Sequence, residues 1–117
     1  MKEPQYHAWI SWLSPKKGGR DAVPLSRSRA DVRFENQKTW PEEGWTLVID
    51  SVKTFKNSRL QVVRIDFLVD EAPHHLIVAG TRFEILDGAR VVANGMVVDA
   101  DSVADVTEQA VEEVLWV

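Results

Sequence analysis

The sequence predicts an all-β fold, a small antiparallel β-barrel of six or seven strands followed by a short C-terminal α-helix. Apolar residues recur at every second position in most runs up to Val98, which is the period of a half-buried strand. Turn residues separate these runs at short intervals, as in small barrels and sandwiches. After Ser102 the apolar spacing changes to three or four residues, which indicates an amphipathic helix.

The first expected strand carries aromatic side chains on both faces. Trp9 and Trp12 fall on opposite faces of this strand, because successive strand residues alternate, so we expect at least one of them to be exposed. Later runs rich in β-branched and aromatic residues predict the other strands. The expected strands cover residues 6–13, 30–35, 45–52, 60–69, 74–79, 82–86 and 90–98.

Glycine positions predict two local features of the closing strands. Asp87-Gly88 lies between two apolar runs and predicts a tight hairpin, because glycine tolerates the positive φ that such a turn requires. Gly95 interrupts a β-branched run, which usually marks a bulge or a close approach of other atoms. Trp40 and Trp45 flank a further turn over residues 41–44.

The C-terminal helix is predicted over about residues 103–116. Val103, Val106, Ala110 and Val114 lie on one helical face. Ser102 followed by Asp105 resembles a weak capping box. The segment is acidic and carries no base after Asp99.

Length and composition indicate one domain over residues 1–117, with the barrel in residues 6–98. The chain has 117 residues, of which 44% are hydrophobic, enough for one core. It has no cysteine, which excludes disulfides, thiolate zinc sites and cysteine nucleophiles. The N-terminus lacks a signal-peptide pattern and no apolar run could span a bilayer, so we expect a cytoplasmic protein without a membrane partner.

Charge is unevenly distributed along the chain. The net charge is −4, which argues against a general DNA or RNA binder, because such proteins neutralise phosphates. The tail after residue 98 is acidic, whereas residues 16–33 are basic. The bases in that stretch are Lys16, Lys17, Arg20, Arg27, Arg29 and Arg33.

The sequence shows no catalytic constellation, and we expect no enzyme, cofactor or metal. His74 and His75 are adjacent and would point to opposite strand faces, so they are poorly placed to share a metal ion. Nothing fixes the geometry of Asp66 and Glu71 as a pair of acids. The chain contains neither a Gly-x-Ser-x-Gly nucleophile motif nor a phosphate-binding P-loop, so we also expect no nucleotide partner.

Two segments carry a family resemblance. The first runs from Leu13 through Gly18-Gly19-Arg20, with Arg29 nine residues later and Phe34 beyond it. The second is the hairpin over residues 82–97. Together they resemble the C-terminal β-barrel domain of translation elongation factor Tu over about residues 6–98, without its GTPase domain. The hairpin positions that match are Arg82, Phe83, Ile85, Gly88, Arg90, Val92, Gly95 and Val97.

The resemblance implies a binding module. In that family the barrel contacts tRNA, a nucleotide-exchange factor and the GTPase domain, and the Gly-Gly-Arg loop touches tRNA. Here Asp21-Ala22-Val23 replaces the family's His-Thr-Pro after Arg20, and a carboxylate repels phosphate, so a protein partner is favoured over RNA. The expected contact residues, at one end of the barrel, are Gly18, Gly19, Arg20, Arg29 and Arg90, with Trp9 and Trp12 nearby.

A second function class stays open. Small size, acidity, five tryptophans and the lack of a catalytic motif are also typical of inhibitors or immunity-type proteins that neutralise a toxin by covering its surface. The sequence therefore leaves two hypotheses, a free-standing binding module and a toxin-neutralising inhibitor, and identifies the partner in neither case.

Overall fold

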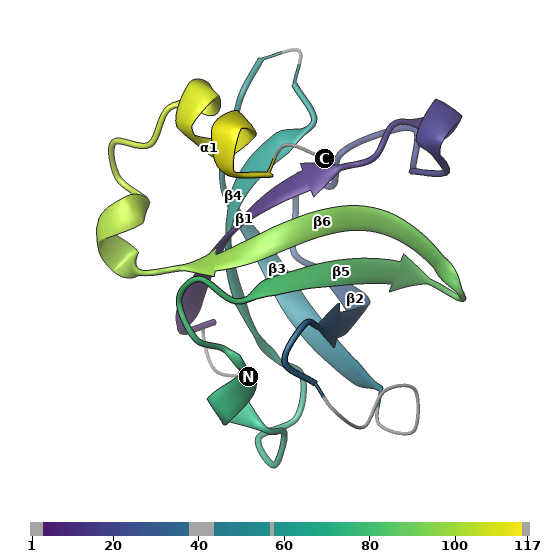
Figure 1. Cartoon of the computed structure of the whole chain (residues 1–117), viewed down its shortest axis with the longest axis vertical. Helices are drawn as coiled ribbons and strands as arrows, with labels where there is room; N and C mark the ends of the chain where they lie inside the picture. Colours follow the sequence, from purple (N-terminus) through teal and green to yellow (C-terminus); the bar gives the residue numbers. More distant parts are fainter. Residues whose placement is uncertain (1–3, 38–43, 57, 116–117) are drawn as a thin grey trace.

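Six strands close into an antiparallel barrel in the order β1-β4-β3-β2-β5-β6 (Figure 1). The computed structural model describes residues 4–37, 44–56 and 58–115. The predicted all-β barrel with a short C-terminal helix is confirmed. The elements are β1 (Tyr6–Trp12), η1 (Pro15–Lys17), β2 (Ser28–Phe34), β3 (Trp45–Thr54), β4 (Leu60–Phe67), η2 (His74–Leu76), β5 (Arg82–Asp87), β6 (Arg90–Val98), η3 (Ala100–Ser102) and α1 (Glu108–Leu115).

Two long connections cross the two ends of the barrel. Strands β2, β3 and β4 are joined in sequence, and β1 pairs with β4 on one side and β6 on the other, which is a Greek-key arrangement. Residues 13–27 lead from β1 to β2 over the end where β6 begins, since Trp12 lies opposite Ala93. Residues 68–81 lead from β4 to β5 over the other end, where Phe34 of β2 lies opposite Phe83.

The barrel interior is filled by the inward-facing set of each alternating strand. Ile10, Val32, Val63, Ile65 and Ile85 are fully buried in it, and each such side chain stabilises the fold by roughly 1.5–3 kcal/mol on burial. Aromatic rings fill the end crossed by residues 68–81. The ring centroids of Phe34 lie 6.0 Å from Phe67 and 5.6 Å from Phe83.

The closing hairpin behaves as its glycines predict. Gly88 has φ +63° in the turn between β5 and β6. A Cβ at Gly95 would lie 2.4 Å from the ring of Phe83, so glycine is required there by the close approach of that ring. The bulge of this strand pair lies elsewhere, because the register shifts between Ile85 and Leu86, beside Val92.

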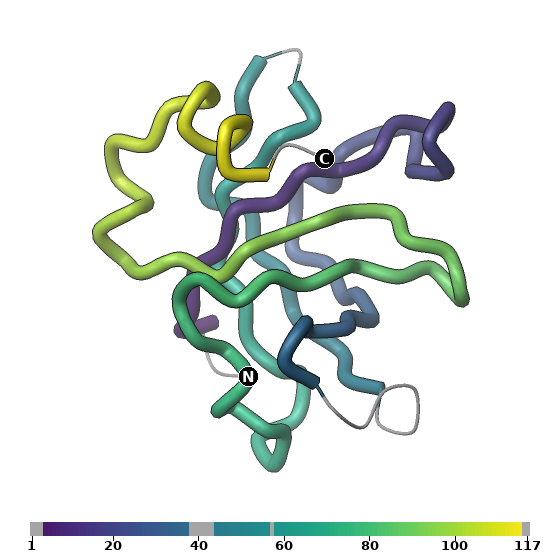
Figure 2. The backbone as a smooth tube through the Cα atoms, viewed as in Figure 1, coloured from purple at the N-terminus to yellow at the C-terminus, as the bar shows by residue number. Residues whose placement is uncertain are grey.

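The C-terminal segment covers the outer face of β1, where Figure 2 shows it passing beside the barrel. Trp9, Val62 and Val98 point outward and are buried against Val106, Val111 and Leu115. The apolar spacing after Ser102 therefore reflects a real packed face.

The predicted start of the helix at residue 103 is wrong, because α1 begins at Glu108. The backbone N–H of Ala110 donates to Oγ1 of Thr107 at 3.2 Å, so Thr107 supplies the side-chain oxygen that a helix start needs. Ser102 instead donates to Asp99 Oδ1 at 3.1 Å. Val103 and Val106 pack in the same cluster as the helix without being helical.

The predicted strand over residues 74–79 is also wrong. Residues 74–76 form η2, and the segment crosses the barrel end as turns. Pro73 and Gly80 bound this run, and Leu76 and Ile77 enter the core directly from the turn, so they do not need strand alternation to be buried. Trp40, the expected turn over residues 41–43 and the helix end at residue 116 lie outside the described residues.

Candidate binding site at the basic end of the barrel

The turn that opens the connection over residues 13–27 requires both of its glycines. Gly18 has φ +90°, a conformation that other residues rarely adopt. A Cβ at Gly19 would lie 1.8 Å from the carbonyl oxygen of Leu13, and the Gly19 N–H donates to the Ser14 oxygen at 2.8 Å. Backbone geometry therefore explains Gly18 and Gly19 without any ligand.

The side chain of Arg59 holds the middle of this connection by donating to backbone carbonyl oxygens. Its Nε donates to the carbonyl oxygen of Trp12 at 3.1 Å, its Nη1 donates to that of Asp21 at 3.4 Å, and its Nη2 donates to that of Arg20. The guanidinium thus fixes the chain on both sides of the turn, because its several N–H donors have a fixed geometry.

Gln61 fastens the far part of the same connection from inside the barrel. It is 1% exposed; its Oε1 accepts from Trp12 Nε1 at 2.8 Å and its Nε2 donates to the Pro24 oxygen at 2.7 Å. Such buried polar groups are costly unless they are paired. Gln61 therefore ties the loop to β1 and to its own strand β4.

The side chains of this connection remain available at the surface. The guanidinium carbon of Arg20 lies 5.7 Å from the Trp12 ring centroid, a cation–π contact. Arg20 and Arg29 line a groove of about 190 Å³ beside Gly88. Arg90 reaches the same region, since a Cβ at Gly18 would lie 3.5 Å from its Cδ. We call this region the basic end; it comprises Lys16, Lys17, Arg20, Arg29 and Arg90.

Most cations of the basic end lack a carboxylate partner. Among the residues that the structure describes, Lys16, Lys17, Arg20 and Arg29 form no ion pair. Arg90 Nη2 lies 3.4 Å from Asp87 Oδ2 in an exposed ion pair. Asp31 accepts a hydrogen bond from the Thr46 hydroxyl at 2.9 Å. The groove beside Arg20 and Arg29 is therefore mixed in charge, with Asp31 and Asp87 in its lining, and Lys17 lines a separate pocket with Glu108 and Glu112. The unpaired cations can still attract an anionic group.

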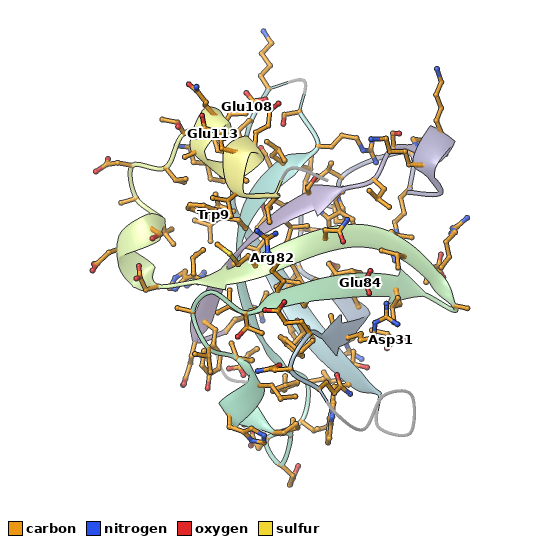
Figure 3. The ribbon with its side chains drawn as sticks, in the orientation of Figure 1. Trp9, Asp31, Arg82, Glu84, Glu108 and Glu113 are labelled. Atoms are coloured by element: carbon orange, nitrogen blue, oxygen red, sulfur yellow. The ribbon has the colours of Figure 1, made fainter. Side chains whose placement is uncertain are left out.

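Two of the predicted arginines, Arg20 and Arg29, line one groove, whereas the predicted tryptophans are buried. Trp9 is 8% exposed and Trp12 is 2% exposed, so the expectation that one of them would be exposed is wrong. Figure 3 shows Trp9 below α1, and its Nε1 donates to the Ser102 oxygen at 3.0 Å. Trp12 points into the core. The burial of both side chains argues against direct contact with a partner.

Arg59 and Gln61 are the residues that the sequence reading missed. Arg59 carried no signal, because a charged residue before a strand is ordinary. Gln61 did carry one: it shares the inward face of β4 with Val63, Ile65 and Phe67, and a polar residue at an inward position requires a buried partner.

The end of the connection is attached to the outer face of the barrel by charge. Arg27 Nη2 lies 2.9 Å from Oδ2 of Asp50, and Arg64 Nη2 lies 3.7 Å from the same oxygen. The hydrogen bond from Arg27, aided by the charges of Arg27 and Arg64, outweighs partial desolvation and lowers the pKa of the Asp50 carboxyl from its ordinary value.

The sequence matches no protein-family model, and no curated protein matches it. Nowhere in the described ranges do three or more His, Cys, Asp or Glu side chains gather in a way that could hold a metal ion. Among the helices of the described residues, none is long and apolar enough to cross a membrane.

Proposed function

We propose that this chain is a non-enzymatic binding module whose basic end holds an acidic surface of a protein partner. The observation that carries the proposal is the combination of a fixed backbone with unpaired cations. Arg59 and Gln61 fix the backbone of residues 20–24, so less ordering is needed on binding. Arginines on a fixed backbone suit carboxylates, which their planar guanidinium binds in a bidentate manner.

The mixture of charges favours a protein partner over RNA. Asp31 and Asp87 line the same groove as Arg20 and Arg29, and Asp21 follows Arg20 directly. RNA binding depends on the neutralisation of many phosphates, which these carboxylates oppose. A protein surface can place acids against the arginines and small or basic residues against the carboxylates.

The resemblance to the C-terminal barrel domain of elongation factor Tu supports a binding role. In that family the barrel serves as a contact surface for other macromolecules. The turn geometry alone requires Gly18 and Gly19, so these two residues are no evidence for a family relationship. The residues that support the resemblance are Arg20, Arg29 and the hairpin over residues 82–97.

The test is affinity purification of the partner from the host with matched charge variants. The double change Arg20→Ala with Arg90→Ala removes two positive charges from the basic end. The control, Lys53→Ala with Lys56→Ala, removes two from the β3–β4 hairpin. We expect the first variant to lose the co-purifying protein and the second to keep it. The first should melt near the wild-type temperature, because such surface changes cost little stability; the second should melt somewhat lower, because Lys53 Nζ donates to the Val106 carbonyl oxygen at 3.0 Å.

Retention of the partner by the folded Arg20→Ala, Arg90→Ala variant would contradict the proposal. A partner that nuclease removes, with an affinity that falls steeply as salt rises, would establish RNA binding instead. For a protein partner, added salt should mainly slow association.

The acidic surface of α1 favours a second candidate function, a toxin-neutralising inhibitor. Glu108, Glu112 and Glu113 are exposed, and Figure 3 shows Glu108 and Glu113 at the surface of the helix. A basic nuclease or pore-forming surface could be covered by such a face. If the partner is a basic toxin, the triple change of these residues to glutamine should abolish capture, whereas the Arg20→Ala, Arg90→Ala variant should retain it.

A further inference from the structure

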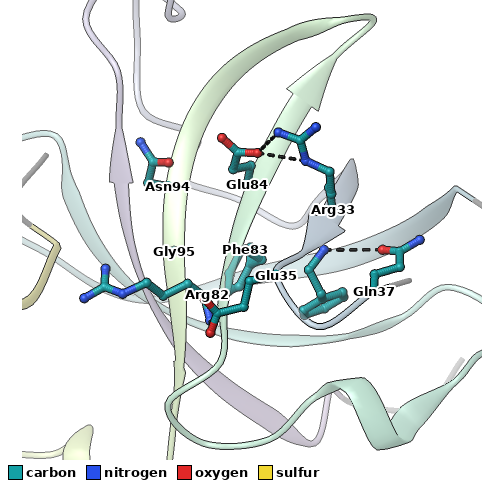
Figure 4. A pocket seen from close by; sticks show the side chains of 9 residues that line it. Arg33, Glu35, Gln37, Arg82, Phe83, Glu84, Asn94 and Gly95 are labelled. Carbon is teal, nitrogen blue, oxygen red and sulfur yellow. Dashed lines mark hydrogen bonds and ion pairs between the residues drawn. The ribbon is translucent and has the colours of Figure 1, made fainter. Parts of the chain in front are cut away.

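A pocket of about 410 Å³ on the outside of β2, β5 and β6 has charged walls whose groups are already bonded within the chain (Figure 4). Arg33 donates to Glu84, Arg82 donates to the Val114 carbonyl oxygen, and Glu35 accepts from the Arg82 backbone N–H. Each charged side chain that the structure describes in this pocket is therefore engaged inside the molecule.

A second pocket, of about 360 Å³, carries opposite charges that do not meet. It lies at the end of β1, where η1 and α1 stand on either side of the strand (Figure 1). Lys17 lines it from η1, and Glu108 and Glu112, one helical turn apart, line it from α1. We call this pocket the η1–α1 groove.

The three charges of the η1–α1 groove are exposed and unpaired. Within the described ranges, Lys17, Glu108 and Glu112 form no ion pair. Arg59 also lines the groove, but its guanidinium donates to backbone carbonyl oxygens of the first connection. The groove thus offers one cation and two carboxylates to groups from outside the chain.

The rest of the groove suits the stem of a lysine side chain. Leu13 and Leu60 are half-buried in its lining, and the methylene groups of a lysine can pack on such apolar surface while its ammonium reaches a carboxylate. The chain itself presents a lysine in this way, because Lys17 stands exposed on the short turn of η1, which begins at Pro15 and ends at Gly18. The molecule therefore carries both the groove and an element that fits it.

We propose that the η1–α1 groove is the interface of a weak symmetric dimer, in which it receives η1 of a second copy of this chain. A two-fold axis between the two η1 turns places Lys17 of each copy against Glu108 and Glu112 of the other. Such an interface is isologous, so the same attraction is made twice. Exposed ion pairs are individually weak, and the net charge of −4 opposes association, so the dimer is transient.

This inference goes beyond the proposed function and can fail separately from it. The groove is not lined by Arg20 or Arg29, which line the groove beside Gly88. Lys17 belongs to the basic end, but dimer formation is measured on the purified chain alone, without the partner. Capture of a partner by the basic end can therefore be lost while the dimer persists, and the reverse.

The test is sedimentation equilibrium of the purified full chain at concentrations up to about 1 mM, which detects weak association. We expect a reversible dimer at low salt that weakens as salt is raised towards about 1 M, where the Debye length is about 3 Å. A chain that stays monomeric at about 1 mM in low salt would overturn the proposal.

Two complementary variants test the symmetric pairing. Lys17→Glu alone, and Glu108→Gln with Glu112→Lys alone, should each weaken the dimer at least about tenfold, because like charges then meet at both contacts. Glutamine at position 108 avoids a positive charge in the first helical turn. An equimolar mixture of the two variants should dimerise at least as tightly as the wild type, because both contacts again join opposite charges.

The matched control is Lys56→Glu, which reverses an exposed charge outside the groove. It should dimerise like the wild type and should not rescue the variant with Glu108→Gln and Glu112→Lys in a mixture. Circular dichroism checks that each variant is folded. A mixture of the two complementary variants that stays monomeric, or a dimer that survives in each variant alone, would refute the pairing of Lys17 with Glu108 and Glu112.

Discussion

Residues 13–27 and residues 68–81 each cross one end of the barrel, but they are held by different chemistry. The second connection places Ala72, Leu76 and Ile77 in the core. The first connection contributes only the partly buried Val23 to the core and is held by the polar side chains of Arg59 and Gln61. A loop that is held by apolar packing buries its own side chains in the core. A loop that is held through its backbone carbonyl oxygens can leave its side chains exposed to solvent.

The consequence is a difference in the surface at the two ends. Arg59 and Gln61 hold the backbone of the first connection, and Arg27 ties its end to Asp50. The exposed side chains of Lys16 and Lys17 take no part in these attachments. The opposite end is closed by an aromatic group: His74 packs edge-on against Phe67 with centroids 5.3 Å apart, and its Nδ1 lies 3.2 Å from the Tyr6 hydroxyl. The first end therefore leaves more charged side chains exposed, as the proposed binding role requires.

The largest expected effect compares one glycine from each connection. In the first, Gly19→Ala would place a methyl group 1.8 Å from a backbone oxygen, so we expect a loss of more than about 4 kcal/mol or failure to fold. In the second, Gly80 has φ +92° but open space around its Cβ position, so Gly80→Ala should cost only about 1–2 kcal/mol for the left-handed backbone. Urea unfolding measures both. Equal losses would show that the first turn can relax.

A smaller effect tests the apolar anchoring. Leu76 is 7% exposed in the core, and Leu76→Ala should cost about 3 kcal/mol through lost burial and a cavity. The counterpart Val23→Ala should cost about 1 kcal/mol, because Val23 is only partly buried. If both changes cost the same in chemical denaturation, the first connection also depends on apolar packing and the contrast between the two ends fails.

The polar anchoring gives the next effect in size. Gln61→Met keeps the shape of the side chain but leaves Trp12 Nε1 and the Pro24 oxygen without their partner, so we expect a loss of about 2 kcal/mol. Amide hydrogen exchange should accelerate in residues 13–27 and remain unchanged in residues 68–81. Unchanged protection of the first connection would show that Arg59 alone is sufficient to hold it.

The two connections also show where prediction from sequence succeeds. The strands were predictable because inward and outward positions alternate, as in Ala30, Val32 and Phe34 against Asp31 and Arg33. The run over residues 74–79 was not, because a short apolar stretch can enter a core from a turn as well as from a strand. The alternation of apolar and polar residues does not show whether such a stretch is a strand or a turn.

The candidate site was predictable only in part. The resemblance implied that Arg20, Arg29 and Arg90 would share one end of the barrel. In the structure Arg20 and Arg29 line one groove, and the Arg90 side chain lies beside Gly18. The burial of Trp9 was not predictable from its own strand, because its cover comes from residues 99–115, about ninety residues away in sequence. When a segment distant in sequence covers an outer barrel face, the sequence of the covered strand does not predict that its outward side chains are buried.

The smallest expected effect concerns the charged attachment of the first connection at Asp50. The hydrogen bond from Arg27, together with the charges of Arg27 and Arg64, lowers the pKa of the Asp50 carboxyl. A carboxyl with a depressed folded-state pKa stabilises the fold above its unfolded pKa, about 3.9, and this stabilisation is lost as the pH falls through the folded value. The effect should be small because Arg27 is 37% exposed.

Asp50→Asn should therefore lower the free energy of unfolding by less than about 1 kcal/mol at about pH 6, the size of an exposed ion pair. The difference from wild type should shrink as the pH falls below the unfolded pKa, about 3.9, and through the lower folded pKa, because the wild-type carboxyl then becomes protonated. Asp101→Asn serves as the control, because Asp101 is exposed and forms no ion pair within the described ranges. A difference at Asp50 that persists undiminished at low pH would mean that the carboxyl acts through its neutral hydrogen bonds. The first connection would then owe its attachment at that point to geometry instead of charge, as it does at Gln61.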